Sequence, residues 1–210
     1  MSAWRLIGRD LRRAWVSGGL VAPLIFFVLV AILFPFAVGP DGALLRRVGP
    51  GVVWAAALLA ALLPVERLVA PDLDGGVVDQ LVLAGLSETA VAAAKVAAHW
   101  LGFAPALMAA TLIAGALFDL DAATLIGLEL ALLAGTPGLA ALGVATAALT
   151  AGLRGAGAVA GLVMLPLALP ILIFGASGGP GGGKLLLAMS LLLLAGAPPV
   201  AGAAMRIARG

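Results

Sequence analysis

The sequence predicts an all-α integral membrane protein with six membrane-spanning helices, preceded by a short amphipathic helix. Of its 210 residues, 63% are hydrophobic and only 10% are charged, and the mean hydropathy is +1.21. Soluble domains carry about 25% charged residues. Apolar runs of about twenty residues recur along the chain, which is the length at which a helix crosses a bilayer. The alternating pattern of an outer-membrane barrel is missing.

The first 17 residues predict an amphipathic helix that lies in the plane of the membrane surface. Trp4, Ile7, Leu11 and Trp15 recur at helical spacing, and the arginines lie largely on other faces. Tryptophan beside arginine suits the headgroup layer. An ordinary basic tail is the alternative, and a cleaved signal peptide fits less well because the apolar run that follows is too long. The residues expected at the membrane surface are Trp4, Arg5, Arg9, Arg12, Arg13 and Trp15.

Turn signals and charges divide the rest of the chain into six expected spans, at residues 20–38, 48–68, 91–118, 124–150, 158–174 and 185–205. Gly135-Thr136-Pro137-Gly138 predicts a kink or break in the fourth span. A glycine-rich loop is expected from Gly175 to Lys184. Pro198-Pro199 weakens the sixth segment, so a five-span alternative has that segment only partly inserted.

The distribution of cations places both termini in the cytoplasm. With the N-terminus inside, nine of the 12 Lys and Arg residues lie on the cytoplasmic side. Excess Lys and Arg in cytoplasmic loops is what sets the orientation of membrane proteins. The inside cations are Arg5, Arg9, Arg12, Arg13, Arg67, Lys95, Arg154, Arg206 and Arg209, and the outside ones are Arg46, Arg47 and Lys184.

A polar insert between the second and third spans, residues 66–90, faces the cytoplasm in this topology, and we name it the coupling segment. After the Gly75-Gly76 break, a short helix is expected with an apolar side and a polar side that carries Asp79 and Gln80. A segment of this kind between apolar spans is where a membrane protein can contact a water-soluble partner. The apolar side comprises Val77, Val78, Leu81, Val82 and Leu86.

The residues available for chemistry are few, which argues against an enzyme. The chain has no Cys and a single His, so disulfides, thiolate metal sites and catalytic triads are not expected. Residues 178–184, GGPGGGK, resemble a phosphate-binding loop, but Leu185 stands where Ser or Thr would hold magnesium and no strand precedes the loop. We therefore expect no nucleotide, metal or nucleic-acid site, and any ATP must be bound by a partner.

Two ionisable residues inside the spans have open interpretations. His99 follows Lys95 by one helical turn, and a lone membrane His can ligate haem or relay protons. Because no second His or Cys is present, a hydrogen-bonded side chain at the interface is the favoured reading, and haem contact at His99 is the weaker one. Glu129 either lines a polar cavity or reaches the headgroups.

Several strings, in order along nearly the whole chain, resemble the CcmB family, a family of permeases in cytochrome c maturation. They are LFPFAVGP (33–40), PGVVWAAALLAALL (50–63), ERL…D…DG…DQLVL (66–83), AAKVAAHWL (93–101), GTPGLAALGVATAALTAGLR (135–154) and LPLALPILIFG (165–175). The resemblance implies one permease domain over residues 1–210, like the ABC-2 exporters, in the bacterial inner membrane.

The resemblance also implies partners. A separate CcmA-like subunit would hydrolyse ATP, and CcmC-like and CcmD-like subunits would share the membrane. The complex would use ATP to export haem, or to transfer haem to a periplasmic CcmE-like chaperone and release it. Haem would be the handled species, and this chain would bind no cofactor directly. The alternative is a passive scaffold that only assembles the haem-handling subunits. The residues expected to contact the ATPase subunit are Glu66, Arg67, Asp72, Asp74, Asp79 and Gln80.

Overall fold

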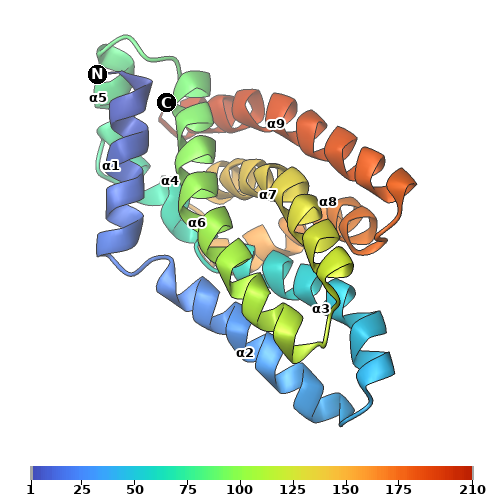
Figure 1. The fold of residues 1–210 in the computed structure, drawn as a ribbon. Coiled ribbons are helices and arrows are strands. Elements are labelled where there is room, and N and C mark those ends of the chain that lie inside the picture. Colours follow the sequence, from blue (N-terminus) through green and yellow to red (C-terminus); the bar gives the residue numbers. More distant parts are fainter. Residues whose placement is uncertain (1, 210) are drawn as a thin grey trace.

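A computed structural model describes residues 2–209, and every regular element in that range is an α-helix (Figure 1). The turns between them are short, and from α6 to α9 each helix packs against the next one along the chain. The helices are α1 (Ala3–Val16), α2 (Val21–Val38), α3 (Gly42–Leu62), α4 (Val65–Asp74), α5 (Val77–Leu83), α6 (Glu88–Leu117), α7 (Ala122–Thr150), α8 (Ala156–Ala176) and α9 (Pro180–Arg209).

The six predicted spans are confirmed. Within the described residues, six helical stretches are long and apolar enough to cross a membrane: α2, α3 continued through α4, α6, α7, α8 and α9. The N-terminal helix and the short helix after Gly75-Gly76 are also present, as α1 and α5. Both described ends of the chain lie at the same end of the bundle, close to α5 and the start of α6 (Figure 1).

Helix α7 is the centre of the bundle, between α6, α8 and α9 (Figure 1). Every position from Gly138 to Ala148 is buried, so this part of the helix is enclosed on all sides rather than along one face. Small residues permit the close approach. A Cβ added at Gly138 would lie 2.9 Å from Ser190 Cα on α9, and the Gly138 N–H donates a hydrogen bond to Ser190 Oγ at 2.9 Å.

Two glycines hold the one fully buried tryptophan in place. Trp54 on α3 is inaccessible to solvent, and its ring lies against Gly135 of α7 and Gly175 of α8. A Cβ at position 135 would come within 2.6 Å of Trp54 Cη2. The packing of α3 against α7 and α8 around Trp54 therefore requires glycine at both positions, since any side chain would occupy the space of the indole.

Three local expectations were wrong. The glycine-rich loop is short, because α9 begins at Pro180 and includes the glycines up to Lys184; the Gly183 N–H donates to the Gly179 carbonyl at 3.1 Å. Proline suits the first position of a helix. Helix α7 continues through Pro137, so of the kink or break expected there the break is wrong. The second span is longer than expected, since Gly42–Asp74 is one apolar stretch, and a turn at Leu63 and Pro64 divides it into α3 and α4.

The sixth segment is continuous, which argues against the five-span alternative. Helix α9 runs through Pro198 and Pro199 to Arg209. Its neighbours α6, α7 and α8 pack against it, and packing by neighbouring helices allows a membrane helix to tolerate proline.

The packing around Trp54 predicts the effect of adding one methyl group. Gly175→Ala should lower the free energy of unfolding by about 1–3 kcal/mol, because the new Cβ overlaps the indole. Gly161→Ala on the same helix is the matched control, since nothing lies within 4 Å of its Cβ position. Thermal unfolding in detergent measures both. Equal melting temperatures for the two variants would contradict this account of the packing.

Candidate functional site

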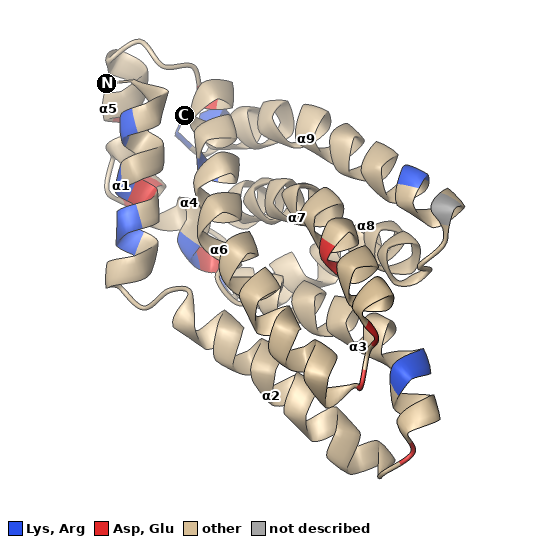
Figure 2. Cartoon of the chain, viewed as in Figure 1, with Lys and Arg blue, Asp and Glu red and all other residues tan. Residues whose placement is uncertain are grey.

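Charged residues lie mainly at the two ends of the bundle (Figure 2). At the end formed by α1, α4, α5 and the start of α6, several of them form ion pairs with one another. Five side chains there form what we name the ion cluster: Arg9, Asp10 and Arg13 from α1, Asp72 from α4 and Lys95 from α6. Three segments far apart in the sequence are thus joined by charge at one point.

Asp72 is the centre of the ion cluster. Asp72 is only 2% exposed, and Lys95 is only 4% exposed. Lys95 Nζ and Arg9 Nη2 each lie 2.5 Å from Asp72 Oδ2, and Arg13 Nη1 lies 3.3 Å from Oδ1. Both carboxylate oxygens are therefore ion-paired, which is the condition under which a charge can be buried.

Asp10 completes the ion cluster on the α1 side. Its carboxylate lies 2.6 Å from Arg9 Nη2 and 3.2 Å from Lys95 Nζ. Burial by itself lowers the pKa of Arg9, but the hydrogen bonds and charges of Asp10 and Asp72 raise it by more, so the net shift is upward. Arg9 consequently stays cationic, and three cations face two carboxylates.

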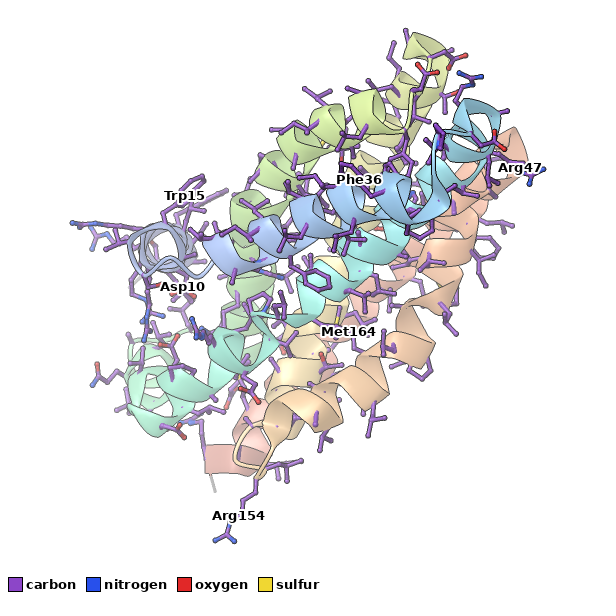
Figure 3. All side chains as sticks on the ribbon, turned by 90° about the horizontal axis from the view of Figure 1, so that it is seen from below. Asp10, Trp15, Phe36, Arg47, Arg154 and Met164 are labelled. Carbon is purple, nitrogen blue, oxygen red and sulfur yellow. The ribbon has the colours of Figure 1, made fainter. Side chains whose placement is uncertain are left out.

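The ion cluster shows that part of the charged side of α1 contacts the bundle. Arg9 and Arg13 both donate to the Asp72 carboxylate, Arg9 from a part-buried position and Arg13 while its side chain stays exposed. Leu6 is the fully buried residue of this helix, whereas Trp4 and Trp15 are exposed. Figure 3 shows Asp10 and Trp15 extending from different sides of α1. Of the six residues expected at the membrane surface, the exposed ones are Trp4, Arg5, Arg12, Arg13 and Trp15.

Sequence reasoning missed Asp10 and the pairing of Asp72 with Lys95. One signal was available for Asp10: it is the one acidic residue among the four arginines of the predicted first helix. No pattern in the sequence joins residues 72 and 95, because their contact depends on where α4 and α6 lie in the folded bundle.

A second set of ion pairs holds the coupling segment to the last helix. The Arg209 guanidinium donates to Asp79 of α5 and to Glu88 at the start of α6, the latter at 2.9 Å. Arg206 Nη2 lies 3.5 Å from the Glu88 carboxylate. Because α5 itself is only about two turns long, these contacts and its buried side fix its position.

The six residues expected to contact an ATPase subunit separate into two groups. Asp74, Asp79 and Gln80 are exposed around the turn between α4 and α5. Leu83 lies on the same side of α5 as Asp79 and Gln80 and is 87% exposed. The opposite side of α5 is buried through Val78 and Leu81. Leu83 is thus an exposed apolar residue with polar neighbours on the same side of α5.

The other three expected contact residues lie on α4, where Glu66 and Arg67 are exposed and Asp72 is not. Asp72 is buried in the ion cluster. The Glu66 carboxylate accepts a hydrogen bond from the Gly157 N–H in the first turn of α8, where a helix favours negative charge. Arg67 is exposed and lines a cavity of about 240 Å³ between α1, α4 and α6.

His99 and Glu129, the two ionisable residues left open by the sequence, are both inside the protein. His99 is 6% exposed and stacks on Phe103 with ring centroids 5.8 Å apart. It lines the same cavity as Arg67, and within the described chain its Nε2 has no hydrogen-bond partner. Both carboxylate oxygens of Glu129 are likewise buried without a partner among those residues.

Comparison with known proteins gives one family. Residues 1–208 match the family model described as CcmB protein. "Heme exporter protein B" of Paracoccus denitrificans is 41% identical over 212 residues, covering 96% of this chain and 97% of the relative. The protein of that name from Bradyrhizobium diazoefficiens is 43% identical, covering 81% and 77%. The one from Escherichia coli K12 is 38% identical, covering 83% and 80%.

The ion cluster predicts a large cost for removing one of its charges. Asp72→Asn should lower the free energy of unfolding by about 3–5 kcal/mol, because the buried Lys95 and the part-buried Arg9 then lose one of their two counter-charges and keep only Asp10. Denaturant unfolding in detergent measures the change, and trypsin cleavage at Arg13 reports release of α1.

Asp74→Asn is the control, because this aspartate is exposed on the same helix and should change stability by no more than about 0.5 kcal/mol. Adding Lys95→Met to Asp72→Asn should restore part of the loss. The same small effect at positions 72 and 74 would show that the ion cluster does not hold α1 and α4 together.

Proposed function

The chain belongs to the CcmB protein family, and from this premise we propose that it is the membrane permease subunit of an ABC-type haem export complex. The relatives that bear the name "Heme exporter protein B" cover most of this chain at about 40% identity. In this proposal a CcmA-like partner hydrolyses ATP, and the chain converts that event into movement of membrane helices.

The observation that carries the proposal is the exposed face of the coupling segment. Asp74, Asp79 and Gln80 surround Leu83, whose side chain projects into solvent. Interfaces are commonly built as an apolar residue within a polar rim. This face lies at the end of the bundle where most cations were expected, which is the side on which a cytoplasmic ATPase is met.

The ion pairs supply the route by which a push on the coupling segment reaches the membrane. Asp72 ties α4 to α6 through Lys95, and Asp79 ties α5 to the end of α9 through Arg209. Helix α4 follows α3 after a turn at Pro64. A displacement of the turn between α4 and α5 is thereby passed to three spans instead of being absorbed locally.

Haem in this proposal is handled chiefly by the partners. CcmC-like and CcmD-like subunits are expected beside the chain, and a CcmE-like chaperone would take up haem on the periplasmic side. Helices α2 and α8 are the least buried of the spans, since only 17% and 22% of the residues in their most apolar stretches are buried. They therefore offer surface to lipid or to these subunits. Both termini would lie in the cytoplasm of a bacterial inner membrane.

Loss of the exposed face should abolish assembly with the ATPase subunit. Asp74→Arg combined with Leu83→Asp removes the apolar contact and reverses a charge in the rim, so co-purification with a co-expressed CcmA-like subunit should fall at least tenfold. Lys184→Glu is the control, because this residue lies in the first turn of α9 at the other end of the bundle. Unchanged co-purification of the double variant would refute this contact.

A second experiment separates a coupled permease from a passive scaffold. Gly75→Pro removes the N–H that donates to the Pro71 carbonyl at 3.2 Å and disfavours helical backbone at Asp74, so the end of α4 should lose its rigidity. We expect assembly to persist while ATP turnover by the complex drops several-fold. Turnover equal to that of the unmodified complex would favour the scaffold.

A further inference from the structure

The cavity of about 240 Å³ between α1, α4 and α6 has two levels. Its charged level is bordered by three cations, Arg13, Arg67 and Lys95, and by two carboxylates, Asp10 and Asp72, and its apolar level by Leu20 and Gly102. Lys95 and Gly102 are seven residues apart on α6, which corresponds to about 10 Å along the helix. The cavity thus passes from charged to apolar surroundings at the cytoplasmic end of the spans.

Two groups at this cavity have unused binding capacity. His99 is buried, lines the cavity and has no hydrogen-bond partner for Nε2 in the described chain; a buried polar atom left unpaired is costly. Arg67 forms no ion pair with any described residue. The nearby acids cannot serve it, because Asp10 and Asp72 are already paired with Arg9 and Lys95.

We propose that this cavity binds the phosphate group of a membrane phospholipid. Arg67 and Arg13 would contact the phosphate oxygens, since guanidinium groups match phosphate geometry. His99 Nε2 would hydrogen-bond to the headgroup, and the acyl chains would extend from the open side of the cavity into the surrounding lipid. Basic pockets between spans on the cytoplasmic side are suited to anionic headgroups.

The size of the cavity favours a headgroup over a whole cofactor. Cavities that enclose drug-sized ligands measure roughly 300–1,000 Å³, and this one is smaller, at about 240 Å³. A lipid seated here would touch α1, α4 and α6, the three helices that the ion cluster joins. The site stands independently of the ATPase contact, which lies on the exposed face of the coupling segment.

The test is lipid binding to the full-length protein in detergent, followed by native mass spectrometry. The unmodified protein should retain one dioleoyl phosphatidylglycerol most tightly, and Arg67→Gln should weaken that first binding event about tenfold. Arg154→Gln is the matched control, since Arg154 is an exposed arginine that projects away from the bundle (Figure 3). Arg67 is also exposed, so neither substitution should disturb folding. Equal binding by both variants would overturn the proposal.

Three further ligands identify the source of the phosphate. Dioleoylglycerol, which lacks phosphate, and glycerol 3-phosphate, which lacks chains, should each bind at least tenfold more weakly than the phospholipid. Glycerol 3-phosphate binding as tightly would assign the cavity to a soluble phosphate compound and overturn the lipid assignment. So would haemin binding that shifts the Soret band in the unmodified protein and fails to do so in His99→Gln.

Discussion

The burial of Asp72 is the constraint on which one end of the bundle depends, the end formed by α1, α4, α5 and the start of α6. A carboxylate taken out of water must be given counter-charges, and here they come from two other helices, Lys95 on α6 and Arg9 on α1. Satisfying one buried charge therefore fixes the positions of three segments at once. The N-terminal helix is held against the bundle by this requirement as well as by the burial of Leu6.

The membrane part is held together by a different principle, the close packing of small residues. Lipid is as apolar as the helix surfaces, so spans associate through shape and van der Waals contact. Helix α7 achieves this with Gly and Ala at its centre, and Trp54 fills the space that Gly135 and Gly175 leave. The spans are thus held by close packing, whereas ion pairs hold the charged end.

That division fits the proposed role. A coupling segment must be accessible to a partner on one face and firmly attached on the other. Helix α5 has both properties, because Leu83 is exposed while Val78 and Leu81 are buried and Arg209 holds Asp79. The cavity beside Arg67 and His99 adds a point at which the surrounding membrane could bind the same three helices. Force from a partner and the composition of the lipid would then act on one structural element.

The six spans, the amphipathic first helix and the short helix after Gly75-Gly76 could be predicted from the sequence alone. Hydropathy and helical periodicity are properties of neighbouring residues and do not depend on how the helices pack. The sequence also identified the coupling segment and its acids, together with the strings that resemble the CcmB family. It did not distinguish Asp72, which is buried, from Asp74, which is exposed, although the two lie within one turn. The tertiary structure decided that difference, along with the pairing of Asp10, Asp72 and Lys95 and the start of α9 at Pro180. The physical reason is that the cost of burying a charge depends on which helices are its neighbours, and neighbours distant in sequence leave no periodic signal.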